Sequence, residues 1–110
     1  MKEVSFTLLG KDYSVRPEFR KIAAIENMTG KGTIQILQEI AESKFKTTDL
    51  VHVLYCMTGG NKVTVDKIGE AVQGKAMEYV APVAEFLAAC NFGSEELASD
   101  EPEASAEKND

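Results

Sequence analysis

The most constraining feature of the sequence is the stretch 4–32, which carries the signals of a short hairpin followed directly by a helix. Val4, Phe6 and Leu8 alternate with small polar residues, the pattern of a strand with one buried face. Residues 10–12, Gly-Lys-Asp, supply turn chemistry, and a second alternating segment follows over 13–16. Because an isolated hairpin is only marginally stable in water, we expect this one to pack on helices.

A proline marks the change from hairpin to helix. Pro17 lacks an amide proton, so it cannot lie inside a strand ladder, but it fits the first position of a helix. Gly30 suits a left-handed cap at the end of that helix. Between them, large apolar residues at spacings of three predict one inward face: Phe19, Ile22, Ile25 and Met28.

Three further helices follow at short intervals. Thr33 is a candidate N-cap for the second, and Thr64 for the fourth, which ends at Gly74. The third opens at 47–49 with a threonine cap, and it is apolar over most of its circumference, which predicts a central position. In the second helix Ile36 falls near the edge of the predicted inward face, which consists of Ile34, Leu37, Ile40 and Ala41.

The last helix is predicted to run from about 75 to 91. Pro82 lies inside it and removes one backbone hydrogen bond, so we expect a kink or a split near 79–81. One apolar stripe contains Met77, Val80, Ala84, Leu87 and Ala88, and Val83 and Phe86 extend it sideways.

These patterns predict a mainly α protein with a small N-terminal β-hairpin (α+β) and about five short helices in a compact bundle. Residues 1–93 are expected to form one globular domain, with the hairpin over 4–16 and helices over about 17–92. Residues 94–110 hold seven acids, one base and a single large apolar side chain, so they predict a disordered acidic tail.

The distribution of charge and of apolar residues limits the partners. The chain has a net charge of −6, all of it in the tail, because residues 1–93 hold eleven acids and eleven bases. A neutral body argues against nucleic-acid binding through a positive face.

No apolar run approaches the roughly 20 residues of a membrane span, and no signal peptide is apparent. The two cysteines, Cys56 and Cys90, are typical of buried residues in a reducing cytosol.

The sequence offers little that could carry chemistry. His52, the one histidine, has Asp49 three positions earlier, which is also an ordinary helix-surface pair. Residues 30–33, Gly-Lys-Gly-Thr, are not a phosphate-binding loop, because the earlier glycine of that motif is absent and a helix precedes them. No metal-ligand spacing occurs. We therefore expect a binding or assembly protein without cofactors in preference to a small enzyme or regulator.

The opening stretch resembles a family of small proteins from tailed phages and gene transfer agents, the tail assembly chaperones of the gene-transfer-agent type, which are sometimes mislabelled as tail tube proteins. The resemblance covers about a third of the chain and includes no catalytic motif, so it transfers no site. Beyond Gly32 it rests on helix number and size. The residues that carry it are Leu8, Gly10, Tyr13, Arg16, Pro17, Phe19, Ile25, Glu26, Thr29 and Gly30.

The resemblance implies a mostly helical chaperone that binds the tape measure protein and recruits tail tube subunits in the host cytoplasm. The alternative is a structural tail component, such as a tube or connector subunit. A tube subunit needs long strands for a continuous ring sheet, and only one short hairpin is predicted here. The family relation also suggests a programmed frameshift, since residues 107–109, Glu-Lys-Asn, can be encoded by the slippery string A-AAA-AAC.

The last helix around Pro82 is the predicted docking face for these partners, because a kinked helix leaves room for another chain. The sequence leaves open whether the protein forms a homo-oligomer. The residues predicted to contact partners are Met77, Val83, Phe86 and Phe92.

Overall fold

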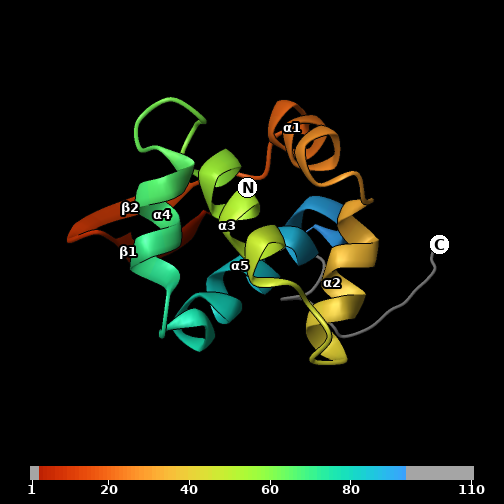
Figure 1. The fold of residues 1–110 in the computed structure, drawn as a ribbon. Helices are drawn as coiled ribbons and strands as arrows, with labels where there is room; N and C mark the ends of the chain where they lie inside the picture. Colours follow the sequence, from red (N-terminus) through yellow and green to blue (C-terminus); the bar gives the residue numbers. More distant parts are fainter. Residues whose placement is uncertain (1–2, 94–110) are drawn as a thin grey trace, which may run out of the picture.

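The computed structural model describes residues 3–93 and contains an antiparallel two-stranded hairpin followed by five helices (Figure 1). This confirms the predicted fold class. The predicted disordered tail lies outside the described residues. The elements are β1 (Val4–Leu8), β2 (Lys11–Val15), α1 (Phe19–Thr29), α2 (Thr33–Ala41), α3 (Thr47–Met57), α4 (Val65–Val72) and α5 (Ala76–Phe92).

The hairpin has a tighter turn than the sequence predicted. Leu8 pairs with Lys11, so the turn consists of Leu9 and Gly10 alone, and the residues that follow already belong to β2. Both turn residues have positive φ, 54° and 75°, as a two-residue type I′ turn requires. The alternation of buried residues along β1 agrees with the predicted strand.

Pro17 does not occupy the first helical position, so that prediction is wrong. The N-cap of α1 is Glu18, whose carbonyl accepts hydrogen bonds from the N–H groups of Lys21 at 2.9 Å and Ile22 at 3.1 Å. Glu18 itself has extended backbone angles, because the chain is still crossing from the hairpin to the helix at this point. Pro17 therefore lies one residue before the cap, and it is buried there.

The predicted end of α1 is confirmed, but its predicted inward face is only partly correct. Gly30 has a φ of 74° and caps the helix. Ile25 is fully buried, whereas Phe19 is 80% exposed and Met28 is 37% exposed. Since α1 packs mainly against α3, only the middle of its apolar stripe is covered.

The second helix begins and packs differently from the prediction. Gly32 is its N-cap, and Thr33 is instead its first residue, with a backbone N–H that donates to Glu26 Oε2 at 3.1 Å. This carboxylate from α1 takes the place of a cap side chain. Ile36, predicted near the edge, is buried, and Ile34, predicted inward, is 48% exposed, because the face that meets α5 is rotated from the predicted one.

The cap predictions for the third and fourth helices had opposite outcomes. The Thr64 hydroxyl accepts a hydrogen bond from the Lys67 N–H at 3.2 Å, so Thr64 is the N-cap of α4 as predicted. Thr47 is not a cap, since α3 begins at this residue and Lys46 precedes it with extended backbone angles.

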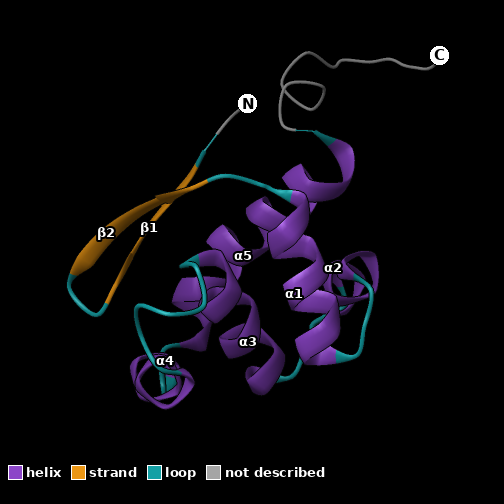
Figure 2. Ribbon diagram, turned by 90° about the horizontal axis from the view of Figure 1, so that it is seen from above, coloured by secondary structure: helices purple, strands orange, loops and turns teal. Residues whose placement is uncertain are grey.

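The third helix is the centre of the molecule, as its apolar circumference predicted. It lies between α1 and α4 and also packs against α5 (Figure 2). Most of its side chains are buried, including Leu50, Val53 and Leu54. The hairpin projects to one side of the helices, and β1 packs against α5.

The last helix is not split at Pro82, contrary to one of the predicted outcomes. It runs unbroken over 17 residues as α5. The helix is amply supported by its neighbours, because α2, α3 and β1 all pack against it. This tertiary packing compensates for the one backbone hydrogen bond that a proline removes.

Candidate protein-binding surface

The face of α5 opposite the core is apolar along the whole helix. Its residues are spaced by three and four positions, so they lie on one side of the helix. Met77 is 74% exposed and Phe92 is 46% exposed, while the alanines between them range from half-buried to exposed. We call this face the α5 stripe, and it consists of Met77, Ala81, Ala84, Ala88 and Phe92.

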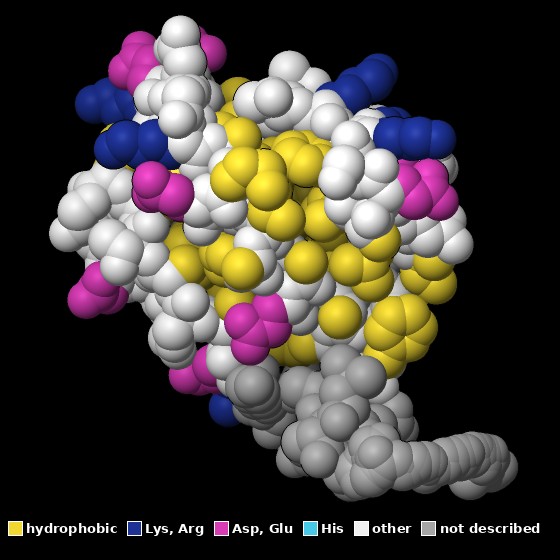
Figure 3. Space-filling model, turned by 90° about the horizontal axis from the view of Figure 1, so that it is seen from below, with side chains coloured by type: hydrophobic (Ala, Val, Ile, Leu, Met, Phe, Trp, Pro, Cys, Tyr) yellow, Lys and Arg dark blue, Asp and Glu magenta, His cyan; other side chains and the backbone are white. Residues whose placement is uncertain are grey.

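The view from below shows hydrophobic side chains gathered over a broad area of one face, with an acidic side chain in its lower part and most other charged side chains around it (Figure 3). The exposed Ile34 of α2, the helix that packs beside α5, adds to the apolar surface of the protein. A large continuous apolar area on a small protein is typical of an interaction site.

The predicted docking residues fall into two groups. Met77 and Phe92 belong to the α5 stripe, where a partner could reach them. Val83 and Phe86 are fully buried and belong to the core, so they form no part of an accessible surface. Because α5 is apolar on both faces, its period alone could not decide which face is inward. The stripe alanines show why the sequence missed the surface, since alanine is equally common in cores.

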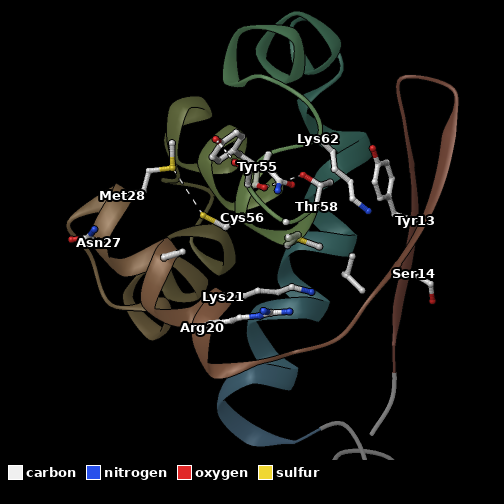
Figure 4. Close-up of a pocket in the computed structure, with 16 residues that line it drawn as sticks. Tyr13, Ser14, Arg20, Lys21, Asn27, Met28, Tyr55, Cys56, Thr58 and Lys62 are labelled. Carbon is white, nitrogen blue, oxygen red and sulfur yellow. Dashed lines mark hydrogen bonds between the residues drawn. The ribbon is translucent and has the colours of Figure 1, made fainter.

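A cleft of about 860 Å³ lies between the hairpin, α1 and the loop that joins α3 to α4 (Figure 4). Arg20 and Lys21 extend into it from α1, and Lys62 extends from the loop. The floor includes Met57 and Cys56. The lining residues comprise three cations and no carboxylate.

A partly buried ion-pair network joins the α1–α2 loop, α2 and α3. The Lys31 ammonium donates to Asp49 Oδ2 at 2.7 Å and to Glu39 Oε1 at 3.0 Å. Hydrogen bonds to Asp49 and Glu39 raise the pKa of Lys31, and the hydrogen bond from Lys31 lowers the pKa of Glu39. The sequence analysis placed Asp49 at a helix start and in a helix-surface pair with His52. It did not predict the contact with Lys31, because the two residues are 18 positions apart in the chain.

The side chains with reactive potential are enclosed. His52 is half-buried, and its Nδ1 has no hydrogen-bond partner within residues 3–93. Burial raises the pKa of both thiols, that of Cys90 to about 11, although the nearby Lys21 ammonium acts in the opposite direction on Cys90. A raised pKa means that neither cysteine is an activated nucleophile at neutral pH.

The described part of the chain contains no group of three or more His, Cys, Asp or Glu side chains placed to hold a metal ion. None of its helices combines the length and the apolarity that crossing a membrane requires.

Comparison with known proteins gave one family match. The model of the family described as "phage tail tube protein, GTA-gp10" matches residues 2–93. No curated protein and no solved structure gave a significant match. The match confirms the coarser part of the predicted resemblance, a phage tail protein, and its description fits the structural alternative better than the chaperone. Because the match spans the hairpin and all five helices, this chain belongs to the phage tail tube protein, GTA-gp10, family.

Proposed function

We propose that this protein works in phage tail morphogenesis as a non-catalytic component that binds other tail proteins through the α5 stripe. The observation that carries the proposal is the stripe itself, an apolar helix face from Met77 to Phe92 that no helix or strand within residues 3–93 covers completely. Burying such a face stabilises a complex by about 25 cal/mol per Å² of apolar area removed from water. On this proposal the protein acts in the host cytoplasm.

The role favoured by the family description is structural, as a component of the tail. Such a role includes contacts between neighbouring subunits, and the stripe offers a surface for them. The alanines in its middle allow another helix to approach closely, while Met77 and Phe92 supply larger contacts at the two ends.

A second candidate is the assembly chaperone, which binds the tape measure protein and recruits tube subunits. The small sheet favours this role. Within residues 3–93 the only strands are the two five-residue strands of the hairpin, which give little backbone for a continuous ring sheet. A helical protein with an exposed apolar face suits transient binding of helical segments.

The binding surface is tested with M77E and F92E, each of which places a charge in the stripe. F19E is the matched control, because Phe19 is also exposed but lies on α1. Co-expression with the tail tube and tape measure proteins, followed by pull-down, should show a fall of about tenfold or more in affinity for the stripe variants. F19E should bind normally, and all three should keep the wild-type melting temperature. Equal binding by all three variants would contradict the proposal.

The structural role and the chaperone role predict different locations of the protein after assembly, so finding it in finished tails or only in intermediates distinguishes them. Mass spectrometry of purified finished tails should detect a structural component at a fixed ratio to the other tail proteins. A chaperone should be present in assembly intermediates that contain the tape measure protein and absent from finished tails.

A further inference from the structure

The cleft beside α1 has an electrostatic character that the α5 stripe lacks. Its lining joins three cationic side chains to an apolar floor, and it contains no carboxylate. Close to it, Glu18 Oε1 lies 3.5 Å from Arg20 Nε and 3.4 Å from Lys21 Nζ. One carboxylate is thus shared between two cations. Lys62 makes no ion pair with any other residue in the described range 3–93, so the cleft has an excess of positive charge.

The end of the described chain lies near this cleft. The Lys21 ammonium is close enough to Cys90 to act on the pKa of its thiol, so the cationic side of the cleft adjoins the last turns of α5. Helix α5 ends at Phe92, and Gly93 is the last described residue. The last described residue is thus only three positions beyond Cys90.

These 17 residues match the cleft in charge and in reach. They carry seven carboxylates and one lysine, whereas residues 1–93 are formally neutral. At about 3.3 Å per extended residue they span up to about 56 Å. That exceeds the longest dimension of the protein, 43 Å, so the segment is long enough to cross the cleft from Lys21 to Lys62.

We propose that the acidic C-terminal segment, residues 94–110, docks into the cleft of its own molecule, with its carboxylates against Arg20, Lys21 and Lys62. Covalent attachment favours this occupant over a separate acidic peptide, because a short tether holds the segment at an effective concentration in the millimolar range.

The contact is tested in the full-length protein by comparing backbone amide NMR spectra of the wild type and a variant with four neutralised acids, E95Q, E96Q, D100N and E101Q. The resonances of the α3–α4 loop, Gly60, Asn61 and Lys62, should shift between the two proteins, and those of α4 should not. Salt at about 1 M, where the Debye length is about 3 Å, should abolish the difference.

A matched pair of lysine variants tests the cleft side. K62Q should move the amide resonances of the C-terminal segment toward their high-salt positions. K67Q removes the same charge from α4, outside the cleft lining, and should leave them in place. Unchanged loop resonances in the four-acid variant, or equal effects of K62Q and K67Q, would overturn the proposal. Shifts that disappear on dilution would assign the cleft to the segment of a second copy and would also overturn it.

Discussion

Leu9 occupies a backbone conformation that most side chains avoid. Its φ of 54° lies in the left-handed region, where the Cβ atom crowds the following carbonyl. The side chain is 51% exposed, so its own packing offsets little of this strain. Asparagine is the residue that best tolerates the first position of a type I′ turn.

L9N should therefore raise the free energy of unfolding by about 0.5–1 kcal/mol, measured from urea denaturation midpoints. L9A is the control, because alanine keeps the Cβ atom and hence the strain, and it should change the stability by less than about 0.5 kcal/mol. A gain from L9A equal to that from L9N would show that the exposed side chain, and not the backbone, is responsible.

The ion pairs of Lys31 predict how the stability of the protein depends on pH. K31M leaves Asp49, which is almost completely buried, and Glu39 without their cation, so the variant should melt at a lower temperature at neutral pH. The pKa of Glu39 is lowered in the folded state, so the stability that it contributes is present above its ordinary pKa of 4.5. That contribution is lost as the pH falls through the folded value.

The melting-temperature difference between wild type and K31M should accordingly be largest near neutral pH and shrink below about pH 4.5. K44M provides the control, because Lys44 is 76% exposed and its nearest carboxylate, that of Glu42, is 3.9 Å away. A difference that stayed constant from neutral to acidic pH would assign the effect of K31M to packing instead of charge.

At the scale of elements, α5 has two apolar faces with different roles. The inner face holds Phe86, which is fully buried, and the outer face holds Phe92, which is 46% exposed. Both phenylalanines were predicted to contact partners, because a kink at Pro82 was expected to leave room for another chain. Only the positions of α2, α3 and β1 determine which face is covered.

F86A and F92A separate these faces with the same chemical change on one helix. F86A should lower the free energy of unfolding by about 3–5 kcal/mol, since it opens a cavity in the core. F92A should lower it by less than about 1 kcal/mol. Denaturant unfolding measures both, and comparable losses would mean that the two faces of α5 are buried to a similar extent.

For the whole molecule, the arrangement around α3 predicts the order of local opening. α3 is covered by α1, α4 and α5, whereas the hairpin projects from the helices (Figure 2). Segments with more buried contacts open less often. In hydrogen exchange followed by NMR, the amides of Leu54 and its neighbours should exchange slowest, and those of the turn at Leu9 and Gly10 fastest. Slower exchange in α4 than in α3 would contradict this assignment of the core.

The sequence by itself determined the local elements, because their signals are local. Each signal that succeeded depends on residues close in the chain or on burial alone. These signals are the alternation in β1, the caps at Thr64 and Gly30, and the apolar circumference of α3. The tertiary structure alone decided what depends on distant partners. It showed Glu26 capping α2, Lys31 neutralising Asp49, and α5 turning Val83 and Phe86 inward while Met77 and Phe92 face out. A helix with large apolar residues on two faces, such as α5, fits a core on either side, so only its packing neighbours reveal which face remains for a partner.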